Sequence, residues 1–126
     1  MNVPANLKYT KDHEWLKIDG ENAFIGISDF AQHELGDIVF IEVETVGEIL
    51  GKHESFGTIE AVKTVSDMYM PVGGEVLEFN EDLTTTPEII NQDPYEKGWV
   101  IKIKITNPAE IDELMDAVQY QAHIQS

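Results

Sequence analysis

The sequence predicts a mainly β protein, a small sandwich or barrel that forms one domain over residues 1–126 and carries a helix near its C-terminus. Three observations predict this fold class. Short runs rich in Val, Ile, Thr and Phe recur along the chain, and these residues favour strands. Turn-forming residues separate the runs at short intervals. A length of 126 residues with 42% hydrophobic residues fits one compact domain with a modest core, expected over about residues 9–106.

The first elements are a hairpin and a short helix. A strand over residues 13–18 and a returning strand over residues 23–27 flank the turn Asp19-Gly20-Glu21-Asn22, in which Asp-Gly is a strong hairpin signal. Ser28 suits the N-cap of a short helix that ends near Gly36.

The middle of the chain adds further strands. Residues 37–43 alternate in hydrophobicity and predict a strand with substantial burial. Its two faces would hold Ile38 and Phe40 on one side, and Val39 and Ile41 on the other. Residues 75–79 form another strand, and residues 81–92 are mostly loop, with a short helix that Pro87 begins.

The C-terminal part ends in a strand and a helix. Residues 99–105 show the clearest period-two pattern, with isoleucines inward and lysines outward. Asn107-Pro108-Ala109-Glu110 resembles a capping box and predicts a helix over about residues 108–122. Helical spacing would place four apolar residues of this helix on one face: Ile111, Leu114, Met115 and Val118.

Composition excludes several classes of function. The chain holds 24 acidic and 8 basic residues, a net charge of -16, which disfavours nucleic acid and anionic membranes and favours partners with basic faces. We therefore expect a monomer. Without cysteine there is no disulfide and no thiolate site, and the histidines lack metal-ligand spacing. The N-terminus has no signal or transit pattern and no run reaches membrane-spanning length, so we expect a cytoplasmic protein.

One lysine, Lys63, stands where two strand-like runs meet within residues 54–67, which places it at or near a hairpin tip. No Gly or Asn marks a tight turn there, and an ordinary surface lysine is the alternative. A faint repeat flanks Lys63, since Gly47-Glu48-Ile49-Leu50 recurs as Gly74-Glu75-Val76-Leu77. Two related halves around a lysine turn would suit a flattened sandwich with quasi-two-fold symmetry, with both glycines at turns or at positive φ.

These residues resemble a known family. Glu60-Ala61-Val62-Lys63-Thr64-Val65-Ser66-Asp67 is similar to the lipoyl-attachment motif of the glycine cleavage system H protein family. Further matching motifs follow in the family's order between about Leu7 and Tyr120: residues 9–15, 26–32, 35–40, 69–76 and 93–99. The resemblance implies a barrel-sandwich hybrid, the fold of lipoyl and biotinyl carriers, extended at both ends.

The resemblance also implies site residues. Lys63 would carry lipoate in amide linkage, and Glu60, Gly47 and Gly74 would serve recognition by the lipoylating enzyme. The loaded arm would rest in a cleft with the carboxylates Glu14, Asp67 and Asp12 and an apolar wall formed by Ile27 and Leu35. The resemblance leaves open which of His33 and Glu34 faces the arm.

The function implied is that of a non-catalytic carrier. The arm would take the aminomethyl group of glycine from glycine decarboxylase, a pyridoxal-phosphate enzyme, and deliver it to aminomethyltransferase. Dihydrolipoamide dehydrogenase would then reoxidise the arm.

Several other functions remain as alternatives. One is an H-like relay of lipoyl or octanoyl groups to other enzymes, and another is a lipoyl domain of a 2-oxo-acid dehydrogenase. Val62 and Thr64 beside the lysine argue against a biotinyl domain, which typically has methionines there. An enzyme built on the paired carboxylates Glu14 and Asp67, and an unmodified interaction module, complete the alternatives.

Overall fold

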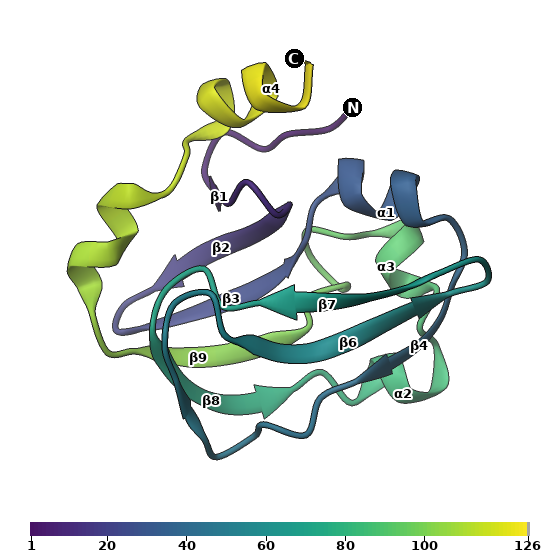
Figure 1. Ribbon diagram of the computed structural model, residues 1–126, viewed down its shortest axis with the longest axis horizontal. Coiled ribbons are helices and arrows are strands. Elements are labelled where there is room, and N and C mark those ends of the chain that lie inside the picture. Colours follow the sequence, from purple (N-terminus) through teal and green to yellow (C-terminus); the bar gives the residue numbers. More distant parts are fainter. Residues whose placement is uncertain (126) are drawn as a thin grey trace.

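The computed structural model describes residues 1–125 and consists of two antiparallel sheets around a shared core, with short helices at the edges (Figure 1). This confirms the mainly β prediction. The six-stranded sheet has the order β1 (Lys8–Tyr9), β2 (Glu14–Asp19), β3 (Asn22–Ile27), β9 (Ile101–Ile105), β8 (Gly74–Phe79) and β5 (Ile49–Leu50). The three-stranded sheet has the order β4 (Ile38–Glu42), β6 (Ser55–Ala61) and β7 (Val65–Tyr69). The helices are α1 (Asp29–Leu35), α2 (Asp82–Thr85), α3 (Ile89–Gln92), the 3-10 helix η1 (Pro108–Glu113) and α4 (Ala117–Gln125).

The first hairpin and helix form as predicted. Asp19 pairs with Asn22, and Gly20 takes a φ of 65°, which is why glycine suits this turn. The Ser28 hydroxyl accepts a hydrogen bond from Ala31 N at 3.1 Å and caps α1. Gly36 ends the helix at a φ of 81°, and its N–H donates to Gln32 O at 2.9 Å.

The main core lies between the two sheets. Ile25 and Ile103 come from the six-stranded sheet, and Phe56 and Ile59 come from the three-stranded one; all are almost fully buried. Each such side chain contributes about 1.5–3 kcal/mol by leaving water. Helix α2, where we predicted loop, adds the buried Leu83 to this core.

The strand predicted over residues 37–43 is β4, but its alternation was wrong. Ile38 pairs with Ala61 and Phe40 pairs with Glu60, so a bulge at Val39 shifts the register. An inserted residue reverses the side on which later residues point. As a result Ile38 and Ile41 both point into the core, whereas Val39 and Phe40 are 46% and 51% exposed.

The single helix predicted over residues 108–122 is also wrong. The 3-10 helix η1 ends before Leu114, which is extended, and α4 begins only at Ala117. Between them Met115 forms a strand bridge with Tyr9, each donating its N–H to the other's carbonyl at 2.9 Å. A backbone paired with a strand cannot remain helical, so this tertiary contact divides the helix.

The capping box predicted at Asn107 and Glu110 does not form. The Asn107 side chain makes no capping bond, and the Glu110 carboxylate instead accepts from Gly73 N at 2.8 Å. The reciprocal cap lies later, where Asp116 and Gln119 each accept the other's backbone N–H. Because the face is interrupted, Val118 is 79% exposed, contrary to the prediction.

A second cluster packs outside the six-stranded sheet and joins the two ends of the chain. It contains Tyr9, Trp15, Tyr95 and Tyr120, together with Leu7. The rings of Tyr9 and Tyr120 stack at 4.6 Å between centroids, which ties α4 to β1 (Figure 1).

The two copies of the faint repeat lie next to each other. Leu50 in β5 pairs with Gly74 in β8, and Ile49 pairs with Glu75. Gly47 has a φ of 92° as predicted, but Gly74 does not have positive φ. A β-carbon at Gly74 would lie 2.7 Å from Lys104 O, so close packing of β8 on β9 explains that glycine.

Candidate functional site

Lys63 occupies the turn that joins β6 to β7, which confirms the predicted hairpin. Ala61 N donates to Thr64 O at 2.8 Å and closes the turn, and Val62 N donates to Asp37 O at 3.1 Å and attaches it to the segment before β4. Among residues 1–125, positive φ angles occur elsewhere and not in this turn, so it needs neither Gly nor Asn. The Lys63 side chain is exposed at the tip.

The aliphatic part of Lys63 lies beside the end of α1. A β-carbon built on Gly36 would be 3.6 Å from Lys63 Cε and 3.9 Å from Nζ. These are ordinary van der Waals distances, so the lysine stem crosses the helix end without a clash. Gly36 directly follows Leu35, which lines a cavity, so Lys63 lies beside the end of the helix that forms part of the cavity wall.

That cavity has a volume of about 150 Å³ and lies between α1, the start of β2 and β7. The structure brings to it all five residues that the resemblance implied for the cleft: Asp12, Glu14, Ile27, Leu35 and Asp67. Six others complete the lining: His13, Ala31, Glu34, Ile59, Ser66 and Met68. One apolar wall thus faces four carboxyl groups. The role of these residues toward a bound arm stays a prediction.

Glu14 is the most unusual group in the cavity because its side chain is buried, with 3% exposure. Thr10 Oγ1 donates to Glu14 Oε1 at 2.7 Å, and Tyr69 N donates to Oε2 at 3.2 Å. Burial raises the pKa of Glu14 to about 7, although these hydrogen bonds act in the opposite direction. The nearby Asp12 raises it further. Near neutral pH this carboxyl group can therefore hold or release a proton.

His13 also lines the cavity, although no pattern in the sequence indicated it. It has a φ of 74°, a left-handed conformation that is uncommon outside glycine. Its Nδ1 lies 2.8 Å from the Tyr120 hydroxyl, which is 2.7 Å from Ser28 Oγ, the cap of α1. Burial lowers the pKa of His13, with His123 adding to the effect. The C-terminal helix thus fixes both the histidine and the helix that carries part of the cavity wall.

The position of α1 decides which of His33 and Glu34 lines the cavity; which of them faces a bound arm stays a prediction. Glu34 lines the cavity together with Leu35 and with Ala31, which lies three residues earlier on the same face of the helix. His33 points elsewhere, and its Nδ1 lies 3.1 Å from Gln32 Nε2. A helical wheel anchored on Leu35 could have found Glu34, since Ala31 and Leu35 are four residues apart.

The three residues assigned to recognition do not lie in the cavity. Glu60 is exposed on β6, between its partners Phe40 and Val65, three residues from Lys63. Gly47 and Gly74 belong to the β5–β8 edge of the other sheet. In Figure 1, β8 begins on the left of the view, whereas the β6–β7 turn projects to the right. The structure therefore separates these glycines from Lys63.

Two classes of feature are absent from the part of the chain that the structure describes. No helix in residues 1–125 has the length and apolar character needed to cross a membrane. Within the same residues, no three His, Asp or Glu side chains are grouped in a way that could hold a metal ion.

Comparison with known proteins assigns the family. Residues 7–126 match the family model described as "Glycine cleavage H-protein". A glycine cleavage system H protein from Chlorobium phaeovibrioides is 56% identical over 122 residues, covering 95% of each chain. One from Halothermothrix orenii is 51% identical over 125 residues, covering 99% of this chain and 98% of the relative.

A solved structure agrees with these sequences. The crystal structure of a glycine cleavage system H protein from Mycobacterium marinum superposes with a TM-score of 0.89 at 35% identity, covering 98% of this chain and 100% of that one. Likeness over nearly the full length in both sequence and fold leaves one conclusion. This chain belongs to the glycine cleavage H-protein family.

Proposed function

We propose that the chain is a non-catalytic carrier that holds lipoate in amide linkage on Lys63. The observation that carries this proposal is the position of Lys63, exposed at a hairpin tip and beside the end of α1, the helix that forms one wall of an acidic cavity. Two further features support the fit. The lysine side chain forms no ion pair within residues 1–125, and the cavity combines an apolar wall with carboxylates.

The protein residues would bind and shelter what the arm carries. A bound lipoyl group supplies a sulfur pair that takes up a one-carbon unit and undergoes reversible oxidation. Ile27 and Leu35 offer apolar contact to a hydrocarbon chain in the cavity, which excludes water from it. Glu14, Asp67 and Asp12 face the same space and can pair with an ammonium group there. An amine-bearing cargo would thus be favoured over a neutral one.

Recognition by the lipoylating enzyme would begin at Glu60. Its exposed carboxylate lies on the outer face of β6 close to the turn, where a docking enzyme can reach both it and Lys63. Gly47 and Gly74 would act indirectly, through the shape of the β5–β8 edge. Support for this comes from the 2.7 Å approach that any β-carbon at Gly74 would make to Lys104 O.

The partners would be those of the glycine cleavage system. We propose transient complexes with glycine decarboxylase, aminomethyltransferase and dihydrolipoamide dehydrogenase, among which the arm shuttles the aminomethyl group of glycine. A net charge of -16 supports docking on basic faces by electrostatic steering, which favours fast association and release.

The first test is the intact mass of the protein from cells that contain lipoate and an active lipoylation system. We expect an increase of one lipoyl group in the native chain and in Lys104→Arg, a matched change at another exposed lysine. Lys63→Arg should show no increase and should lose glycine decarboxylase exchange activity. An unmodified native chain, in cells where another carrier is lipoylated, would refute the proposal.

A further inference from the structure

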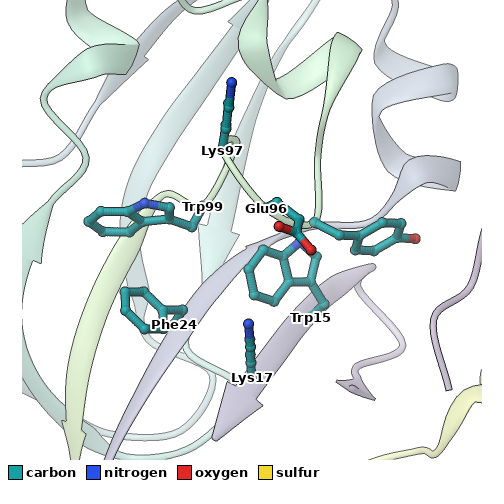
Figure 2. A pocket seen from close by; sticks show the side chains of 7 residues that line it. Trp15, Lys17, Phe24, Glu96, Lys97 and Trp99 are labelled. Atoms are coloured by element: carbon teal, nitrogen blue, oxygen red, sulfur yellow. The ribbon is translucent and has the colours of Figure 1, made fainter. Parts of the chain in front are cut away.

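A second cavity, of about 310 Å³, lies on the opposite side of β2 from the acidic one. Successive residues of a strand point to opposite faces, so Glu14 faces the first cavity and Trp15 the second. Figure 2 shows this second cavity, with Trp15, Trp99 and Phe24 around its centre. The two cavities share no lining residue, so the proposed arm site leaves this one unexplained.

The aromatic walls of this cavity are held in place by the fold. Trp15 is 1% exposed, and its Nε1 donates to Pro94 O at 3.0 Å. Its ring lies so close to Gly26 that a β-carbon there would be 2.7 Å away. Opposite, Trp99 meets Phe24 edge-to-face at 5.2 Å between centroids. A partner that enters the cavity therefore has little ordering to induce in its walls.

The rim of the cavity is basic in an acidic protein. Lys97 and Lys17 stand at opposite ends of the cavity in Figure 2, and both are exposed. Within residues 1–125 neither ammonium group forms an ion pair, and Glu96 is the one carboxylate of the lining. The acidic cavity on the other side of β2 has four carboxyl groups and no lysine in its lining. The linings of the two cavities thus differ in the sign of their charge.

We propose that this cavity is a docking site for an acidic segment of a partner protein, which places an aromatic side chain over the buried Trp15, beside Trp99 and Phe24, and places carboxylates on Lys17 and Lys97. Charge complementarity selects the acidic segment. A volume of about 310 Å³ is at the lower limit for a free small molecule, whereas one ring attached to a chain gains further contacts at the exposed rim. Binding energy in interfaces concentrates in well-packed pockets that are rich in tryptophan and shielded from water by their surroundings.

The two tryptophans are the only ones in the chain, so they report on this cavity alone. We would titrate the full-length, 15N-labelled protein with the end-blocked peptide Glu-Phe-Glu and follow both indole N–H signals by NMR. We expect both signals to shift and saturate. The peptides Glu-Ala-Glu and Lys-Phe-Lys should each bind at least about fivefold more weakly. The first lacks the aromatic ring, and the second lacks the carboxylates.

Rim variants provide the matched comparison. Lys17→Gln with Lys97→Gln should weaken Glu-Phe-Glu binding at least about fivefold. Lys8→Gln with Lys11→Gln removes the same charge away from the cavity and should leave binding unchanged. Lys63→Arg should bind Glu-Phe-Glu as tightly as the native protein does. That result would show that peptide binding at this cavity does not depend on the proposed lipoyl arm.

Three outcomes would overturn the proposal: absence of saturable indole shifts, equal binding of Lys-Phe-Lys, or indole shifts on dilution of the protein alone. The last would assign the cavity to a second copy of the chain.

Discussion

The buried carboxyl group of Glu14 makes stability depend on pH in a way that one substitution can remove. Because burial raises its pKa to about 7 from an ordinary value of 4.5, the folded protein holds a proton that the unfolded chain releases. The unfolded state therefore binds fewer protons between these two values, and the free energy of unfolding falls as pH rises from about 4.5 to about 7. Below this pH window Glu14 does not lower the free energy of unfolding. Above the window, the amount by which Glu14 lowers it no longer changes with pH.

The magnitude follows from the size of the pKa shift. A change from 4.5 to about 7 corresponds to roughly 3 kcal/mol at about 1.36 kcal/mol for each pKa unit. Most of this, about 2–3 kcal/mol, falls between about pH 5 and pH 8. Glu14→Gln has almost the same shape but no proton to release. The difference in free energy of unfolding between the native protein and the variant should therefore change by that amount across this range, in favour of the variant at high pH.

Urea denaturation followed by tryptophan fluorescence at several values between about pH 5 and pH 8 measures this difference directly. Glu21→Gln, a matched change of an exposed carboxyl group in the first hairpin turn, should give no such trend. In Glu14→Gln the new side-chain amide presents a donor at a position where the carboxylate accepted a hydrogen bond. This mismatch shifts the plot of unfolding free energy against pH by about 1 kcal/mol without changing its slope.

Two results would refute the reasoning. One is parallel pH profiles of the native protein and Glu14→Gln. The other is an NMR titration of the Glu14 carboxyl carbon with its midpoint near the ordinary value of 4.5, which would show that burial does not hold the proton.

Four further predictions concern the packing of the chain. Tyr120→Phe removes a hydroxyl that contacts His13 and Ser28, and it should lower the free energy of unfolding by about 1–2 kcal/mol in urea denaturation; unchanged stability would contradict the hydrogen-bond network. Gly26→Ala brings a β-carbon within 2.7 Å of the Trp15 ring, and overpacking should lower stability by about 1–3 kcal/mol with altered tryptophan fluorescence. Gly20→Ala, at a φ of 65° with open space around it, should cost about 1 kcal/mol from backbone strain and leave the fluorescence unchanged. Val118→Asp, at a position 79% exposed, should change stability by less than about 0.5 kcal/mol in thermal unfolding, whereas a large loss would indicate that Val118 packs as the single-helix prediction required.

Local signals predicted the elements that depend on few residues. The turn at Gly20, the cap at Ser28 and the helix end at Gly36 all form as expected, because each needs one residue in one conformation. The hairpin that carries Lys63 was also predictable. Its flanking runs have strand-forming residues, and its turn closes between Ala61 and Thr64.

The candidate site was predicted from resemblance more than from local pattern. Asp12 and Glu14 are far from Asp67 in the sequence, and no spacing rule links them. Resemblance brought these residues together, and the structure places them around one cavity. The resemblance did not supply His13, whose position depends on a left-handed backbone and on Tyr120 at the far end of the chain.

By itself the sequence determined the mainly β class and the strong excess of acidic residues, because these follow from local propensity, turn chemistry and composition. It also indicated that two strand-like runs meet near Lys63, although no turn residue marks that hairpin. Tertiary structure decided what depends on contacts between distant residues. The bridge of Met115 to Tyr9 divides the C-terminal helix, and the bulge at Val39 turns Ile41 inward. Burial by the surrounding elements is what raises the pKa of Glu14, since desolvation depends on how the whole chain encloses a group.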